Sequence, residues 1–156
     1  ARQFQRGVVL KQVETALGES GIPPSKLELE LTESVLMHDG ELVTGALRQL
    51  KALGVKLSID DFGTGYSSFA YLRRFKCDKI KIDQSFVHDL IDDPDNAAIV
   101  RGIISLAQSL GLDVLAEGVE NVAVAQRLKH LRCTYAQGYY FSRPLRPELF
   151  LERVNA

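Results

Sequence analysis

Two adjacent aspartates, Asp60 and Asp61, end an apolar run and precede the glycine-rich segment Phe62-Gly63-Thr64-Gly65. Neighbouring carboxylates repel each other, and burying either one is costly unless a cation compensates its charge. The pair therefore indicates a metal site. The alternative is a solvated pair at a strand end followed by an ordinary turn, and the dipeptide alone favours that alternative.

Further charged or polar side chains fall at the ends of other expected strands, namely Glu30, Lys81, Glu117 and Gln137. Four carboxylates and one lysine on a common rim need a divalent cation to be electrostatically stable. Oxygen ligands favour magnesium or manganese over zinc. Two such ions sharing Asp60 would suit hydrolysis of a phosphate ester. Each residue on its own could be a surface carboxylate or a salt-bridge partner, but a purely structural account of the whole set is the weaker one.

Lys81 admits two chemical roles. A lysine inside a barrel can form a Schiff base with a carbonyl substrate, but acidic neighbours keep an ammonium protonated and argue against that role. As an ammonium, Lys81 would hold the attacking water or the phosphate oxygens. The three histidines, His38, His88 and His130, lie on expected loops or a helix end and are assigned no chemistry.

The elements that must position these side chains alternate between strand and helix. Period-two patterns predict strands at 26–31, 55–60, 79–83, 113–117 and 135–139. Helical spacing, caps and breakers predict helices at 5–20, 39–53, 69–75, about 95–110, 120–131 and from Pro147 onward. The third long helix is expected to bury Ile99, Ile103, Leu106 and Leu110, and residues 84–95 are expected to form a loop before it.

Alternating strands and helices predict a parallel sheet covered by helices. Each strand is apolar on one phase and polar on the other, as in Leu57 and Ile59 against Ser58 and Asp60. A doubly wound sheet would be apolar on both phases, so the pattern favours a TIM-type (β/α)₈ barrel. A full barrel needs about 250 residues, and the 156 residues here predict an incomplete portion with five strand-helix units.

The composition is that of an ordinary soluble domain, with 46% apolar and 25% charged residues. The net charge of −1 provides no general attraction to DNA or to a membrane surface. Cys77 and Cys133 are read as reduced core thiols. Because the sequence has no membrane-spanning apolar run or secretory leader, we expect a cytoplasmic domain whose parent protein could still be tethered to a membrane.

Five motifs, in this order, resemble those of EAL-domain cyclic di-GMP phosphodiesterases, which act on a bacterial second messenger in signalling. They are Glu30-Leu31-Thr32-Glu33-Ser34, Asp60-Asp61-Phe62-Gly63-Thr64-Gly65-Tyr66-Ser67-Ser68, Lys81-Ile82-Asp83, Ala116-Glu117-Gly118-Val119-Glu120, and Gln137-Gly138-Tyr139 with Pro144. The resemblance runs along the whole chain and implies a barrel that uses two magnesium or manganese ions to open cyclic di-GMP to linear pGpG.

The resemblance also implies roles for individual residues. Glu30 and Asp60 would bind a first ion, with Asp60 bridging to a second ion held by Asp61. Glu117 would be the catalytic glutamate and Lys81 the lysine that contacts the hydrolytic water. Glu120 and Gln137 would line the site, and Glu33 would brace the loop after the paired aspartates, which the family ties to metal binding and to dimerisation.

One departure concerns the front of the domain. The family's Glu-Ala-Leu signature and its metal-binding asparagine belong to strands that would precede residue 1, so residues 1–156 are interpreted as the C-terminal part of one domain without its first three strands. We expect this portion alone to be inactive. The alternatives are a cyclic di-GMP receptor without turnover, and a dimerisation module that forms a homodimer or edge-paired oligomer through unpaired strands.

Overall fold

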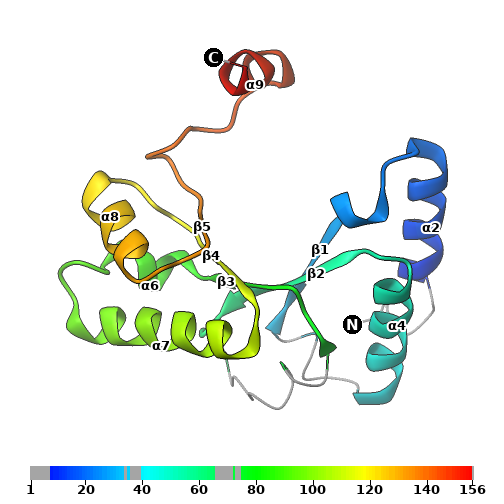
Figure 1. Cartoon of the computed structure of the whole chain (residues 1–156), viewed down its shortest axis with the longest axis horizontal. Helices are drawn as coiled ribbons and strands as arrows, with labels where there is room; N and C mark the ends of the chain where they lie inside the picture. Colours follow the sequence, from blue (N-terminus) through cyan, green and yellow to red (C-terminus); the bar gives the residue numbers. More distant parts are fainter. Residues whose placement is uncertain (1–7, 34, 36–39, 66–71, 73–74, 156) are drawn as a thin grey trace.

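Five parallel strands lie side by side in chain order in the computed structural model, which describes residues 8–33, 35, 40–65, 72 and 75–155 (Figure 1). The strands are β1 (Glu28–Thr32), β2 (Lys56–Phe62), β3 (Lys79–Ile82), β4 (Asp113–Ala116) and β5 (Tyr135–Ala136). All five were predicted, although β5 has only two residues. The parallel sheet and its sequential order confirm the α/β class and are consistent with part of a TIM-type barrel.

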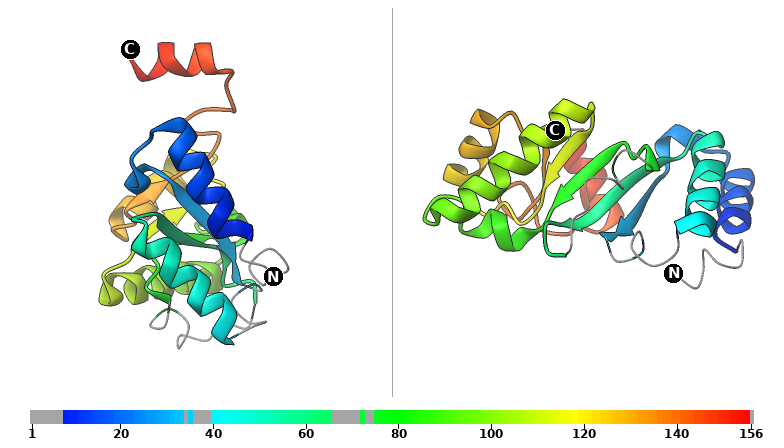
Figure 2. Two further views of the ribbon diagram at one scale, coloured as in Figure 1. Left: turned by 90° about the vertical axis from the view of Figure 1, so that its right-hand side faces the viewer. Right: turned by 90° about the horizontal axis from the view of Figure 1, so that it is seen from below.

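Helices connect the strands, because a parallel neighbour can be reached only by a crossover. They are α2 (Val8–Ser20), α4 (Gly40–Ala52), α6 (Gln84–His88), α7 (Pro94–Leu110), α8 (Val122–His130) and α9 (Pro147–Val154). The sheet is curved, with α2 and α4 beside its first strands and α7 and α8 beside its last ones, while α9 stands apart (Figure 1 and Figure 2). Asp39 and most of the predicted helix at 69–75 lie outside the described residues.

The hydrophobic core lies between the outer face of the sheet and the helices. Leu57, Ile80 and Ile82 are fully buried, and Ile59 and Val114 nearly so, all on the phase predicted to be apolar. Burying one such side chain contributes roughly 1.5–3 kcal/mol, so this face stabilises the packing of α4 and α7 on the sheet. The opposite phase carries the charged side chains that form the candidate site.

Helix α7 corrects the sequence prediction in one respect. Its buried side chains are Val100, Ile103, Ile104 and Ala107, whereas Ile99 and Leu110, expected on the buried face, are 40% and 38% exposed. The predicted C-terminus is correct, since Gly111 adopts the left-handed conformation at φ 70° that commonly ends a helix. The face of the helix that contacts the sheet is therefore rotated by about one residue from the prediction.

The segment at 84–95 also differs from the loop that was predicted. It begins with α6, a five-residue helix capped by Asp83, whose carboxylate accepts hydrogen bonds from the backbone N–H and the hydroxyl of Ser85. Val87 and Leu90 anchor this segment in the core. As a result, α6 lies directly after the strand that carries Lys81.

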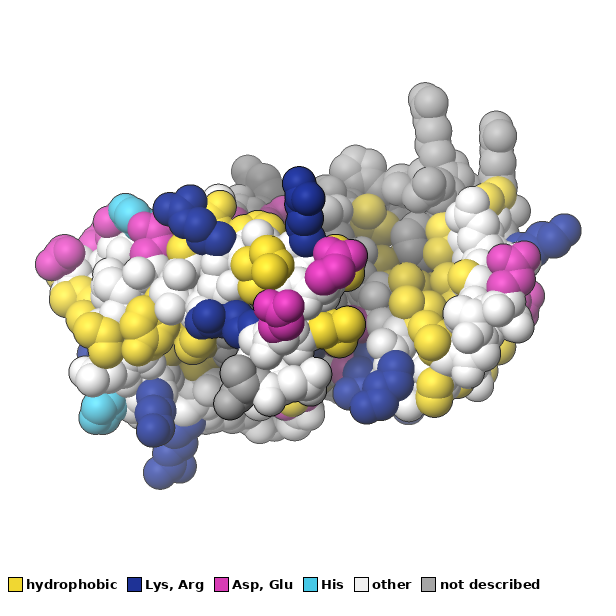
Figure 3. Space-filling view, turned by 90° about the horizontal axis from the view of Figure 1, so that it is seen from above, with side chains coloured by type: hydrophobic (Ala, Val, Ile, Leu, Met, Phe, Trp, Pro, Cys, Tyr) yellow, Lys and Arg dark blue, Asp and Glu magenta, His cyan; other side chains and the backbone are white. Residues whose placement is uncertain are grey.

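The C-terminal segment exposes much of its apolar surface. Seen from above, exposed hydrophobic side chains are visible on this side of the molecule (Figure 3), and the large ones in the segment include Tyr139, Tyr140, Phe141, Leu149, Phe150, Leu151 and Val154. The apolar side chains of α9 are thus exposed among the described residues. None of the described helices combines the length and hydropathy that a membrane span requires.

Candidate metal centre and its surroundings

Lys81 on β3 lies at the centre of the charged cluster. Its Nζ atom is 2.8 Å from Glu30 Oε1, 2.8 Å from Asp60 Oδ1 and 2.9 Å from Glu117 Oε1. The three carboxylates come from β1, from β2 and from the residue directly after β4. The sequence prediction that strand-end residues meet on one rim is realised in this geometry, because parallel strands bring their carboxyl ends to the same edge.

The electrostatic environment keeps the Lys81 side chain charged. Burial by itself lowers the pKa of this lysine, but hydrogen bonds to Asp60, Glu30 and Glu117 outweigh burial and raise the pKa above its usual value. A protonated amine has no lone pair for attack on a carbonyl carbon. This environment therefore argues against the Schiff-base role and favours the ammonium role.

A β-bulge explains how two consecutive residues reach the same site. Successive side chains of a regular strand point to opposite faces, but the register of β2 against β3 shifts between Ile59 and Phe62. Within this shift Asp61 has a φ of 54°, a left-handed conformation that aspartate tolerates better than most residues. The bulge brings both aspartate side chains to one side of the sheet edge.

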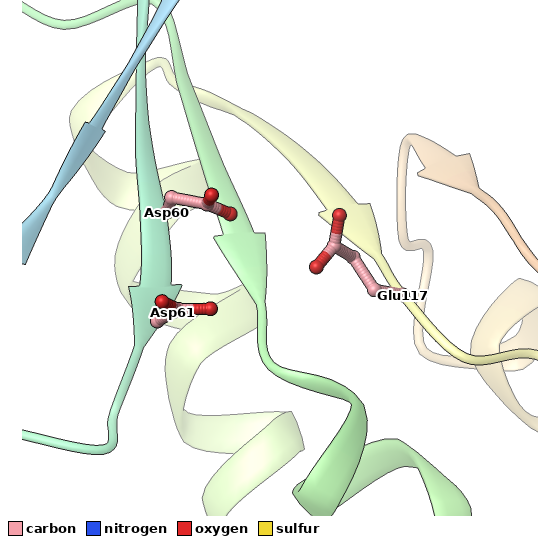
Figure 4. Close-up of side chains that lie close together, drawn as sticks. All are labelled: Asp60, Asp61 and Glu117. Carbon is pink, nitrogen blue, oxygen red and sulfur yellow. The ribbon is translucent and has the colours of Figure 1, made fainter.

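Asp60, Asp61 and Glu117 converge from two elements (Figure 4). Each offers a carboxylate oxygen, and the three oxygens all lie within 4.8 Å of one another. Burial raises the pKa of Asp61, and the charges of Asp60 and Asp83 raise it further. A cation beside these carboxylates would relieve that repulsion, so the arrangement fits a divalent metal ion held by oxygen ligands.

Glu30 belongs to the same cluster but meets it through Lys81. Its side chain is half exposed, and the group of three converging oxygens does not include it. Below it, Glu28 and Lys79 form a second ion pair at 2.7 Å, and the Lys79 ammonium lies 5.2 Å from the centre of the Tyr135 ring. The polar face of the sheet thus carries two layers of ion pairs.

Glu33 lies beside the loop that follows the paired aspartates. Its carboxylate is buried, and it has no hydrogen-bond partner among the residues that the structure describes. A Cβ atom at Gly65 would be only 3.0 Å from Glu33 Oε2. Glu33 therefore lies directly beside Gly65 in the loop that it was predicted to brace. Residues 66–71 of that loop lie outside the described part of the chain.

Two hollows adjoin the cluster at its outer side. One, of about 230 Å³, is lined by Gln84, Glu117, Gly118, Glu120, Gln137, Gly138 and Tyr139. The other, of about 330 Å³, shares three of these residues and adds Ser85, His88 and Asp89. Glu120 and Gln137, which were predicted to line the site, both line the smaller hollow. Sequence reasoning missed Gln84, Tyr139 and His88, and the signal that could have found the first is its place two residues beyond the last residue of β3.

Backbone hydrogen bonds join the two loops that form the smaller hollow. Val119 donates its N–H to the carbonyl of Gln137 at 3.0 Å and accepts from the N–H of Tyr140 at 3.0 Å. Gly138 permits this contact, because a Cβ atom there would lie 2.1 Å from the Val119 carbonyl oxygen. The loop that begins with Glu117 is thereby fixed to the end of β5.

The chain matches the family model described as "EAL domain" over residues 1–144. The chain belongs to the EAL domain family. It is 44% identical over 154 residues to the bifunctional diguanylate cyclase/cyclic di-GMP phosphodiesterase MucR of Pseudomonas aeruginosa, covering 99% of the chain and 22% of that relative. This EAL chain therefore spans about a fifth of the length of that relative.

Solved EAL structures share its fold. The MucR phosphodiesterase in complex with c-di-GMP superposes with a TM-score of 0.90 at 43% identity, covering 95% of this chain and 60% of that one. The manganese/cyclic di-GMP complex of Klebsiella pneumoniae BlrP1 gives a TM-score of 0.80 at 35% identity, covering 88% of this chain and 35% of that one. The fold of the present EAL chain is thus that of the family.

Proposed function

We propose that this chain is the C-terminal part of a cyclic di-GMP phosphodiesterase domain that hydrolyses cyclic di-GMP to linear pGpG. The observation that carries the proposal is the meeting of carboxylates from β1, β2 and the end of β4 around Lys81. Relatives whose names include this activity, and a relative solved with the dinucleotide, support it. Three further strand-helix units would complete the barrel. The location of the domain in the cytoplasm stays a prediction.

Magnesium or manganese is the proposed cofactor, because hard oxygen ligands suit these ions. Asp60, Asp61 and Glu117 would hold one ion, and Glu30 with Asp60 would contribute to a second. When bound, the two ions would polarise the phosphoryl oxygens and increase the acidity of a bound water. The relative solved with manganese and the dinucleotide supports this choice.

The protein's own side chains would position the substrate and move one proton. The Glu117 carboxylate would accept the proton of the attacking water, and the Lys81 ammonium would orient that water or a phosphoryl oxygen. Glu120 and Gln137, which line the smaller hollow, would contact the dinucleotide. Glu33 would keep the loop after Asp61 in place through its contact at Gly65.

The decisive experiment compares hydrolysis by the whole protein that contains this chain with that of its Glu117→Gln variant. Loss of a general base should lower kcat by about 100-fold or more in the presence of manganese. Glu148→Gln is the matched control, since Glu148 is an exposed carboxylate on α9. If both variants hydrolyse cyclic di-GMP equally well, the proposed role of Glu117 is wrong.

The whole protein that contains this chain can also be tested for whether it is a phosphodiesterase or a cyclic di-GMP receptor without turnover. Calorimetry in calcium measures binding of cyclic di-GMP, and formation of pGpG measured in parallel with manganese reports turnover. Tight binding without product would favour a receptor. We also propose that the 156-residue chain alone has little or no turnover; a rate equal to that of the whole protein would contradict this.

A dimerisation role is the second candidate, because a specific surface favours it. Within the described residues β1 and β5 lie at the two edges of the sheet, and the C-terminal segment exposes Phe150, Leu151 and Val154. Exposed strand edges and apolar side chains commonly pair with another chain. Light scattering should therefore give the mass of a dimer or larger species for the 156-residue chain.

A further inference from the structure

The Lys81 ammonium is ion-paired with three carboxylates of the cluster at once. An ammonium group has three N–H donors and no acceptor, and Lys81 Nζ lies within 2.8–2.9 Å of three carboxylates. Its side chain is only 6% exposed. While these ion pairs last, the positive charge of Lys81 is shared among three carboxylates of the cluster.

Two of its three partners also belong to the group of converging oxygens. Asp60 and Glu117 each contact Lys81, and each offers an oxygen to the proposed metal centre together with Asp61. An ammonium and a divalent ion that share two carboxylates repel each other strongly at such short range. Binding of a divalent ion to Asp60 and Glu117 therefore weakens their ion pairs with Lys81, and these ion pairs in turn weaken binding of the ion.

The ammonium also keeps the carboxylates together. Glu30, Asp60, Asp61 and Glu117 bring four negative charges to one edge of the sheet, and like charges at this separation favour spreading apart. Lys81 connects β1, β2 and the end of β4 through ion pairs with N···O distances of 2.8–2.9 Å. Without it, the side chains would have to separate or take up protons.

We propose that Lys81 is an internal counter-ion that competes with a divalent cation for Asp60 and Glu117, and that holds these carboxylates in place until the cation displaces it. The inference rests on the proposed metal-dependent function. Displacement releases Lys81 from at least one of these ion pairs, so that its ammonium becomes available to the attacking water or the phosphate. Metal binding and the readiness of Lys81 for its role in the reaction are thereby coupled.

Lys79 provides a matched control for this competition. It lies two residues earlier on the same strand, on the same face of the sheet, and is also partly buried in an ion pair, at 2.7 Å from Glu28. Removing the Lys79 ammonium changes the charge of the polar face by the same amount as removing that of Lys81. The Lys79 substitution, however, leaves the ion pairs of Asp60 and Glu117 with Lys81 in place. Any difference between the two lysine variants therefore reports direct competition and not a long-range effect of charge.

Calorimetric titration of the whole protein that contains this chain with MnCl₂ tests the proposal. Lys81→Gln should bind manganese at least about tenfold more tightly than the wild type, because the ion no longer has to displace the ammonium from Asp60 and Glu117. Lys79→Gln should change the affinity by less than about threefold, because its charge is more distant and partly screened. Circular dichroism checks that each variant keeps its helices.

A second measurement uses the wild-type chain and does not depend on the folding of a variant. With ¹³C-labelled lysine, the Cε resonance of Lys81 should shift during a MgCl₂ titration, while that of Lys79 stays in place. A stationary Lys81 resonance at saturation overturns the proposal, as does manganese binding by Lys81→Gln that is equal to or weaker than that of the wild type. If no variant binds manganese at all, the metal centre itself is refuted together with the competition.

Discussion

Replacing Gly138 by alanine should disrupt the junction between the Glu117 loop and the end of β5. The added Cβ atom would lie 2.1 Å from the carbonyl oxygen and 2.3 Å from the nitrogen of Val119. Both neighbours are backbone atoms, so no side chain can rotate away to make room. The two loops must therefore separate, and the hydrogen bonds that join Val119 to Gln137 and Tyr140 must break or lengthen.

The magnitude of the Gly138→Ala effect follows from these contacts. Inserting a group into a closely packed position costs about 1–3 kcal/mol, and losing two backbone hydrogen bonds costs about 1 kcal/mol each. The free energy of unfolding should fall by roughly 3–5 kcal/mol. For a chain of this length, that corresponds to a decrease in Tm of roughly 6–20 °C.

Urea denaturation followed by circular dichroism measures this change, with Gly102→Ala as the control. A Cβ atom at Gly102, in the middle of α7, would meet nothing within 4 Å. Alanine there should stabilise the helix by roughly 0.5–1 kcal/mol. If Gly138→Ala unfolds within about 0.5 kcal/mol of the wild type, the close approach to Val119 does not hold the loop and the reasoning is refuted.

Three further changes have expected outcomes. Asp78→Ala should lower the free energy of unfolding by about 2–3 kcal/mol in urea titrations, because the Asp78 carboxylate accepts hydrogen bonds from Lys51 at 2.7 Å and from the backbone N–H of Leu57 at 2.8 Å. Burial raises the pKa of the Cys77 thiol to about 11. The thiol of the unfolded chain ionises near pH 9, so the contribution of the neutral Cys77 thiol to the free energy of unfolding is fully present below pH 9. This contribution decreases by about 2–3 kcal/mol in all as the pH rises toward 11. Asp61→Asn should weaken manganese binding by about tenfold or more in calorimetry, because it removes one anionic ligand.

Each of these changes has a control that can contradict it. Asp92→Ala removes an exposed carboxylate from the α6–α7 connection, and equal stability losses in the two variants would show that Asp78 is not a special anchor. Cys77→Ala should show a shallower loss of stability between pH 9 and pH 11 than the wild type, and parallel curves would contradict the thiol assignment. Glu152→Gln, on exposed α9, is the control for Asp61→Asn and should leave the affinity for manganese unchanged. If Glu152→Gln lowers the affinity as much as Asp61→Asn does, the effect is a nonspecific one of charge.

The strands and their order could be predicted because their side chains alternate. Leu57 and Ile59 are buried and apolar, while Ser58 and Asp60 between and after them lie on the polar phase, so a period of two identifies both the strand and its two faces. The convergence of Glu30, Asp60, Lys81 and Glu117 follows from the same pattern. Parallel strands must end at a common edge, and the sequence alone gives the residue at each end.

The orientation of α7 could not be predicted as well. The helix carries apolar residues on a wide stripe from Ile99 and Val100 to Leu110, and the sequence does not indicate which side of that stripe meets the sheet. Contacts with β3 and β4 select the side with Val100 and Ile104. Helix α6 was missed because five residues are too few for a helical period to appear.

The details of the site depend on backbone geometry that a residue pattern does not contain. Adjacent aspartates in a regular strand would face opposite sides, and only the register shift at Ile59 to Phe62 brings Asp60 and Asp61 together. A common rim for Lys81 and the carboxylates was predicted, but direct ion pairs from Lys81 to three of them at once were not, since the separations across the rim depend on the curvature of the sheet. The register shift at the paired aspartates could have been suspected from the charge repulsion between Asp60 and Asp61.

The sequential strand order has an evolutionary consequence for the site. Because β1, β2, β3 and β4 are neighbours in both sequence and space, each strand-helix repeat donates its own member of the cluster: Glu30, the aspartate pair, Lys81 and Glu117. Recombination that exchanges a single repeat between homologous genes would thus replace one donor and leave the others untouched. Ligand sets could diversify stepwise, without any intermediate that has to rebuild the scaffold.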